Sequence, residues 1–139
     1  MSRPLVSAAA VLAVLGLTGP ASADEPLDCS DPRNTYEINV CGDRAFKAAD
    51  DDLNAVYQKA LKAIPGLAVN EVPEFNAKAW EKALRESQRA WVAFRDAECG
   101  PHTAMFWSGG TGTTGAVLGC KTEKTKQRTE ELKEHYNID

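Results

Sequence analysis

Residues 38–64 read INVCGDRAFKAADDDLNAVYQKALKAI, and this stretch carries the pattern that decides the fold. Apolar side chains recur there at steps of three and four residues, which places them along one stripe of an amphipathic helix. They are Ile38, Cys41, Ala45, Ala49, Leu53, Val56, Ala60 and Ile64. Asn34, with Glu37 three residues later, resembles a capping box, and Pro65-Gly66 is a stop signal. The sequence therefore predicts one long helix between these two signals.

A second stripe of the same kind follows a connection bounded by Pro65 and Pro73. Its members again step by four and three residues, which predicts a helix from Glu74 to Glu98. They are Trp80, Leu84, Ser87, Trp91, Phe94 and Glu98. We expect the three aromatic side chains of this stripe to pack in the core. Two long helices with a short connection should form an antiparallel hairpin.

The periodicity disappears between Gly100 and Gly119, where the composition changes to Gly, Thr and Ser. Residues 107–115 read WSGGTGTTG, and four glycines among nine residues disfavour a regular helix because glycine loses much backbone entropy on folding. We predict a loop here. The charged segment from Lys121 to Tyr136 then predicts a shorter C-terminal helix. The expected fold is all-α, an antiparallel hairpin of two long helices plus this shorter helix.

The first 23 residues have the order of a secretory signal peptide. Arg3 precedes an apolar run from Leu5 to Leu17, which is too short for a membrane-spanning helix, and Ala21-Ser22-Ala23 supplies a cleavage site. We expect a mature domain of residues 24–139, exported to the periplasm or the extracellular space and without a membrane anchor. Cleavage removes one of the 16 basic residues and none of the 20 acidic ones, so the net charge changes from −4 to −5. This acidity argues against nucleic acid as a partner.

Four cysteines remain in the mature chain, and an exported protein meets an oxidising compartment. Three pairings are possible. Cys29 with Cys41 and Cys99 with Cys120 need the shortest loops, so two disulfides between sequence neighbours are expected. The chain has no C-x-x-C motif of the kind that binds zinc.

Catalytic and metal-binding patterns are weak in this sequence. Cys99 and His102 could be drawn as a thiol–imidazole pair, but an oxidised cysteine beside a solvated histidine is the simpler interpretation. The run Asp50-Asp51-Asp52 lacks the Gly and the distal Glu of a calcium loop and reads as a solvated helix face. We therefore expect no enzyme activity, no metal and no cofactor.

The Gly-rich segment is the candidate recognition site. Trp107 beside small polar residues is a composition typical of binding loops, where an aromatic anchor is joined by adaptable hydroxyl groups. The predicted partner-binding residues are Trp107, Ser108, Thr111, Thr113 and Thr114. The alternative is that Phe106 and Trp107 fold back to cap the helical core.

Several motifs together resemble the lysozyme inhibitor LprI-like family. They are Asp28-Cys29, Asn39-x-Cys41, Ala49-Asp50-x-x-Leu53-Asn54-x-x-Tyr57 and, most specifically, Gln88-Arg-Ala-Trp91-x-x-Phe-Arg95-Asp-Ala-Glu-Cys99, followed by a Gly-rich segment and Cys120. The resemblance spans about Cys29 to Leu132. It implies an exported, mostly helical, four-cysteine domain. The named member is a lipoprotein, whereas this chain lacks a lipid-attachment cysteine after its leader.

The resemblance also implies a function, inhibition of lysozyme. Animal lysozymes are commonly basic and hold two carboxylates in a sugar-binding cleft. An acidic domain would be attracted to such an enzyme, and the hydroxyl-bearing loop could occlude the cleft. Gln88 and Arg95 we assign to a structural polar network between helices, because buried polar groups are usually hydrogen-bonded. The alternative function is an envelope ligand-binding or structural interaction domain with no enzyme target.

Overall fold

The computed structural model describes residues 27–139, and every regular element within that range is helical. Three long helices, α1 (Thr35–Leu67), α2 (Ala77–Ala97) and α4 (Thr113–Tyr136), account for most of it. Short helical turns lie between them: a 3₁₀ turn η1 (Pro73–Phe75), a π-helical turn η2 (Glu98–His102) and α3 (Thr103–Phe106). The all-α class is confirmed. The expected signal peptide, residues 1–23, lies outside the described residues.

The start of α1 has the capping box that the sequence predicts. The side chain of Asn34 accepts a hydrogen bond from the backbone N–H of Glu37 at 3.0 Å. In return, the Glu37 carboxylate accepts one from the Arg33 backbone N–H at 2.7 Å and one from the Asn34 side chain at 2.8 Å. The first of these bonds satisfies an N–H group that a helix start otherwise leaves unpaired, and the other two hold Arg33 and Asn34 against the first turn. At the other end, Pro65 lies within the last turn and the helix ends at Leu67.

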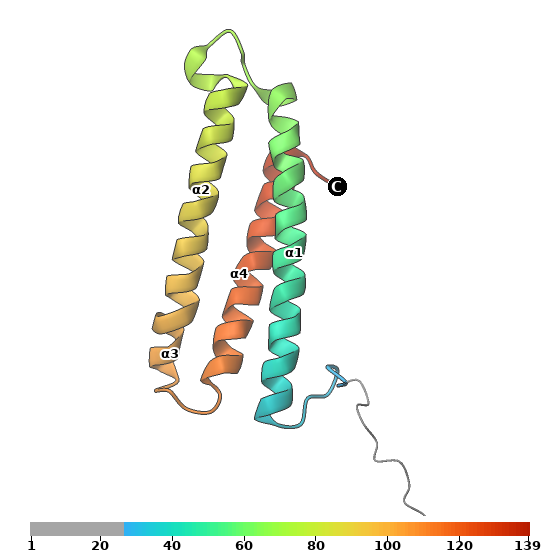
Figure 1. The fold of residues 1–139 in the computed structure, drawn as a ribbon, viewed down its shortest axis with the longest axis vertical. Helices are drawn as coiled ribbons and strands as arrows, with labels where there is room; N and C mark the ends of the chain where they lie inside the picture. Colours follow the sequence, from blue (N-terminus) through green and yellow to red (C-terminus); the bar gives the residue numbers. More distant parts are fainter. Residues whose placement is uncertain (1–26) are drawn as a thin grey trace, which may run out of the picture.

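The three long helices lie side by side as a bundle (Figure 1). α1 and α4 run in the same direction, and α2 runs in the opposite direction. The most extensive packing is between α1 and α4, which are the first and last helices in the chain. The expected hairpin pairs α1 with α2, but this pair does not have the most extensive packing in the bundle. The C-terminal helix is also not the shortest, since α4 has 24 residues and α2 has 21.

A stripe of threonines forms most of the face that α4 buries. Thr122, Thr125 and Thr129 are all buried, in register with Leu132 and Tyr136 at steps of three and four residues. The hydroxyls of Thr122 and Thr129 donate to the backbone carbonyls four residues earlier, at 2.8 and 3.0 Å. A threonine bonded in this way satisfies its hydroxyl within its own helix and leaves its methyl group free to pack. This is why a segment that reads as polar can form a core face.

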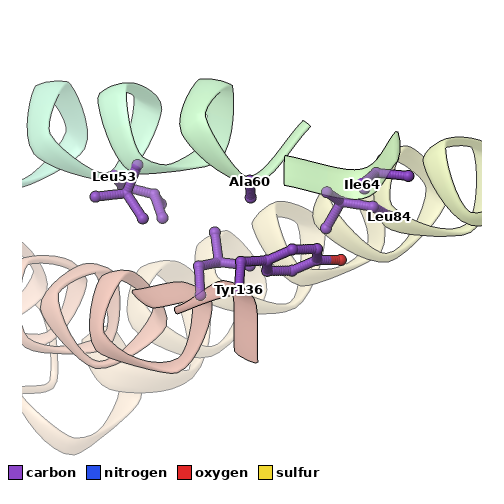
Figure 2. Close-up of a cluster of buried hydrophobic side chains, with 7 residues drawn as sticks. Leu53, Ala60, Ile64, Leu84 and Tyr136 are labelled. Atoms are coloured by element: carbon purple, nitrogen blue, oxygen red, sulfur yellow. The ribbon is translucent and has the colours of Figure 1, made fainter. Parts of the chain in front are cut away.

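The hydrophobic core lies between α1, α2 and α4, toward the end of the bundle where α1 finishes (Figure 2). Its buried members are Leu53, Val56, Ala60, Ile64, Leu84, Leu132 and Tyr136. Trp80 packs against this cluster and donates its indole N–H to the hydroxyl of Tyr136 at 3.0 Å. Trp91 also packs against it, as expected. Phe94 does not: its exposed fraction is 54%, and the ammonium of Lys124 lies 5.1 Å from its ring centre.

The loop prediction for residues 100–119 is wrong over most of its length. The chain is helical from Glu98 to Phe106, and α4 begins at Thr113, so the irregular segment is only residues 107–112. Two glycines explain part of this result. A Cβ on Gly115 would lie 3.1 Å from Cγ2 of Ile38, and a Cβ on Gly42 would lie 3.2 Å from Cβ of Leu118. These glycines allow α1 and α4 to approach closely, so packing outweighs their low helix propensity.

Two disulfides join Cys29 to Cys41 and Cys99 to Cys120. This is the pairing expected from the sequence. Both bridges lie at the end of the bundle where α1 begins (Figure 1). The first ties the segment before α1 to that helix, and the second ties the end of α2 to the beginning of α4. Among residues 27–139, no helix has the length and apolarity that a membrane span requires.

The glycines of α4 give a matched stability test. Nothing lies within 4 Å of a Cβ placed on Gly119, whereas one on Gly115 meets Ile38. Gly119→Ala should therefore stabilise the protein by about 0.5–1 kcal/mol through helix propensity. Gly115→Ala should gain less or lose stability, because Ile38 must move. Urea unfolding of the two variants measures both effects, and equal stabilisation would show that the α1–α4 contact tolerates a methyl group there.

Candidate functional site

The connection between α2 and α4 has a defined local structure. Pro101 lies inside the π-helical turn η2, where its missing N–H cannot continue the regular helical ladder. After α3 the chain reverses at Ser108 and Gly109, which have φ angles of 49° and 68°. A hydrogen bond of 2.9 Å from the Gly110 N–H to the Trp107 carbonyl closes this turn. The connection is thus a compact helical cap with one tight turn.

Large apolar side chains are exposed on this cap. The exposed fractions of Met105, Phe106 and Trp107 are 75%, 78% and 50%. Tyr36 and Ile38, in the first turn of α1, are also exposed at the same end of the bundle (Figure 1). We call these five residues the exposed apolar end. Exposed apolar groups of this size, when they gather in one patch, are characteristic of surfaces that bind a partner.

The position of Trp107 argues against one of the two sequence-based interpretations, in which its ring folds back to cap the helical core. Its ring lies against Gly112 of its own turn, where a Cβ would be only 2.5 Å from Cζ3 of the indole. Trp107 therefore does not reach the hydrophobic core, and one half of its surface remains accessible. Contact with the turn fixes the ring without burying it. Gly112 is required here because any larger residue would displace the indole.

The other residues predicted to bind a partner have different surroundings. Ser108, Thr111 and Thr114 are exposed close to Trp107 in the chain. Thr113 is half-buried in the first turn of α4, and its hydroxyl oxygen is buried without a hydrogen-bond partner among the described residues. Three of the four hydroxyl-bearing residues are therefore exposed.

Met105 and Phe106 are more exposed than Trp107, although the sequence did not single them out as binding residues. Phe106 contacts the imidazole of His102 edge to face, with ring centres 5.1 Å apart. Nδ1 of His102 lies 3.3 Å from the carboxylate of Glu98. These contacts hold α3 against the preceding turn. One feature of the sequence could have indicated their exposure: the three large apolar residues Met105, Phe106 and Trp107 are consecutive in a segment without helical periodicity.

Arg95 is the buried centre of an ionic cluster whose two carboxylates, those of Asp50 and Asp96, are partly exposed. Its exposed fraction is 6%, and its guanidinium donates to Asp50 of α1 at 2.9 Å, to Asp96 at 3.1 Å and to the hydroxyl of Thr125 on α4 at 3.2 Å. The rings of Phe46 and Trp91 lie 5.1 and 5.2 Å from Cζ of Arg95. The planar, multidentate guanidinium suits such a site, which joins all three long helices.

Gln88 belongs to a separate set of hydrogen bonds. Its side-chain oxygen accepts from Nε of Arg128 on α4 at 3.2 Å, and Arg128 also bonds to Ser87 and Glu131. Gln88 and Arg95 were expected to form one structural polar network between helices. Each residue does join α2 to α4. The two bond to different partners, and they do so at different positions along α2.

Asp96 has the most informative electrostatic surroundings in the cluster. Desolvation alone would raise the pKa of its carboxyl group. Hydrogen bonds and charge from Lys121, whose ammonium is 3.1 Å away, and from Arg95 outweigh desolvation and lower the pKa below its usual value of 3.8. The native fold thus favours ionised Asp96.

The described residues hold no arrangement that suggests catalysis by a thiol or a metal. Cys99 is fully buried and bonded to Cys120, so it cannot act as a nucleophile with His102. Within residues 27–139, no group of three or more His, Cys, Asp or Glu side chains could hold a metal ion. Of the run Asp50–Asp52, only Asp50 joins the Arg95 cluster, and its two neighbours are exposed.

These features define a class: a small helical protein, held by two disulfides, that exposes apolar side chains at one end. The profile of the family described as "Lysozyme inhibitor LprI" matches residues 29–132. The chain belongs to this family, as the sequence motifs suggested.

A relative in Rhizobium meliloti (strain 1021) is 36% identical over 132 residues, which cover 92% of this chain and 93% of the relative. That protein is described as uncharacterized. No solved structure matches the chain significantly.

Replacement of Arg95 should test whether the cluster depends on the shape of the guanidinium. Arg95→Lys keeps the charge but cannot reach Asp50, Asp96 and Thr125 together, so we expect a loss of about 2–4 kcal/mol in unfolding free energy. Arg89→Lys, on an exposed face of α2, is the control and should change little. A small, equal effect in both variants would contradict the proposed dependence on geometry.

The lowered pKa of Asp96 predicts a specific acid dependence. A carboxyl whose pKa is lower in the native state stabilises the fold when the pH is above its unfolded pKa, and this stabilisation is lost as the pH falls through the folded value. Asp96→Asn should therefore be less stable than the native protein near neutral pH, with the difference shrinking below about pH 4. Urea unfolding across this range measures it. Asp51→Asn, exposed on α1, is the control.

Proposed function

We propose that the mature chain, residues 24–139, is a single-domain binding protein of the periplasm or extracellular space that inhibits lysozyme. Membership of the LprI family supports the target, and the two disulfides are consistent with export to an oxidising compartment. In this proposal the chain has no catalytic activity and uses no cofactor. It acts by binding.

The exposed apolar end is the proposed contact surface. It combines Phe106, Met105 and the half-exposed ring of Trp107 with the accessible hydroxyls of Ser108 and Thr111. This is the observation that carries the proposal, because aromatic anchors surrounded by small polar groups supply much of the affinity in protein interfaces. Exposed aromatic side chains at the end of the bundle would be suited to enter an enzyme cleft and occlude it.

The covalent structure behind the surface supports tight binding. The Cys99–Cys120 bridge joins the two ends of the segment that presents Phe106 and Trp107, and the ring of Trp107 is already held against Gly112. Little conformational freedom then has to be lost on association, which raises affinity without adding contacts. The acidity of the mature chain would assist its encounter with a basic lysozyme.

Titration of the purified, oxidised protein into a cell-wall lysis assay tests this function. We expect loss of lysozyme activity near equimolar protein, and weaker inhibition at high salt because part of the attraction is electrostatic. Phe106→Ser and Trp107→Ala should each weaken inhibition about tenfold or more, since a hot-spot aromatic contributes about 2 kcal/mol or more. Thermal unfolding of Phe106→Ser should be close to native, because the side chain is exposed.

Phe75→Ser is the matched control, since Phe75 is a comparably exposed aromatic at the opposite end of the bundle. It should leave inhibition unchanged. Equal weakening by Phe75→Ser would place the contact elsewhere on the molecule. No inhibition of animal or bacterial lysozymes by the native protein would overturn the proposed function and favour an interaction domain with another envelope partner.

A further inference from the structure

A second feature is a hollow of about 540 Å³ lined in part by the connection between α1 and α2. That connection lies at the opposite end of the bundle (Figure 1). The lining of the hollow comes from the connection, from η1 and from the first turns of α2. The lining residues are Val69, Glu74, Phe75, Ala79, Trp80 and Ala83. Its volume and mostly apolar lining are those of small-molecule sites.

Two alanines of α2 line the hollow, and we call them its floor. Ala79 and Ala83 are four residues apart and so share one face of α2, where their short side chains leave space between the larger groups around them. Trp80 is one wall, and its indole is held in place by the hydrogen bond to Tyr136. Binding in the hollow would therefore not require Trp80 to move.

The connection that forms the other wall is also ordered by hydrogen bonds. The backbone N–H of Phe75 donates to the Val72 carbonyl at 2.9 Å, and that of Val72 donates to the Val69 carbonyl at 3.2 Å. The Asn70 side chain accepts from the Ala77 N–H at 3.3 Å, which joins the connection to the start of α2. Phe75 nevertheless has an exposed fraction of 65%, so its ring is available to a ligand.

The charge of the lining indicates which class of ligand the hollow would favour. Glu74 is the single charged residue that lines the hollow, and it makes no ion pair with any other residue of 27–139. A carboxylate beside the rings of Phe75 and Trp80 favours a cation, because aromatic faces attract positive charge and bind quaternary ammonium groups well. The apolar floor favours a hydrocarbon part in the same ligand.

We propose that this hollow binds a small organic ammonium compound with an apolar body, its cation beside Glu74 and its hydrocarbon part over Ala79 and Ala83. The site is separate from the exposed apolar end and does not depend on the inhibition of lysozyme. A second copy of the chain is a poorer occupant, since stable dimers bury about 800 Å² per partner and this site is a local hollow between six residues.

The experiment is a titration with octyltrimethylammonium, octanoate and 1-octanol, followed by NMR of the tryptophan indole N–H groups. The signal of Trp80, identified by its absence in Trp80→Phe, should shift and saturate with the ammonium compound. Octanol should bind at least threefold more weakly and octanoate more weakly still, because a carboxylate and two aromatic faces favour positive charge. The signals of Trp91 and Trp107 should change little.

Two variants locate the site. Ala83→Leu fills the floor of the hollow and should abolish the shift, whereas Ala93→Leu, on an exposed part of α2 outside it, should not. Glu74→Gln should remove the preference for ammonium over octanol, and Glu134→Gln on α4 should retain it. Absence of saturable binding, equal binding of all three probes, or a concentration-dependent dimer that removes the Trp80 shift would each overturn the proposal.

Discussion

The buried guanidinium of Arg95 is the interaction on which the arrangement of the three long helices depends. Among residues 27–139, it is the one group that bonds to α1, α2 and α4 together, through Asp50, Asp96 and Thr125. A buried charge is tolerated only when its hydrogen-bonding capacity is met, so the three partners must approach it at the same level of the bundle. The cluster therefore fixes the register of the helices in a way that apolar contacts alone do not.

The threonine stripe of α4 makes this arrangement possible. Thr125 presents its hydroxyl to Arg95, while Thr122 and Thr129 satisfy theirs on the backbone of their own helix. Small side chains with internally bonded hydroxyls let α1 lie close to α4 without leaving polar atoms unpaired. Gly42 and Gly115 extend the close approach toward the beginning of both helices. The exposed apolar end is carried on this rigid base.

The sequence predicted the features that arise from local rules. The periodic apolar residues from Leu53 to Ile64 predicted α1, and Asn34 with Glu37 predicted where it begins. The Gly-rich segment was misread because glycine propensity is a local property, whereas the use of glycine at position 115 is tertiary: a Cβ there would lie 3.1 Å from Cγ2 of Ile38 on α1. The burial of Thr125 was not predicted either, because it depends on a tertiary contact, the hydrogen bond to Arg95. For the proposed site, composition pointed to Trp107, but the greater exposure of Phe106 is a tertiary property that no periodicity in the sequence indicates.

The two disulfides and the hydrophobic core occupy opposite ends of the bundle. Cys41 and Cys120 lie near the beginnings of α1 and α4, whereas Ile64 and Tyr136 lie near their ends. The bridges close short loops, with sequence separations of 12 and 21 residues, and each contributes on the order of 3 kcal/mol by restricting the unfolded chain. The end where α1 begins is thus stabilised by disulfides, and the end where α1 finishes is stabilised by burial of the hydrophobic core. A thiol reductant and a chaotrope would therefore loosen different halves of the same molecule, and local opening measured by hydrogen exchange would start from the half that each agent attacks.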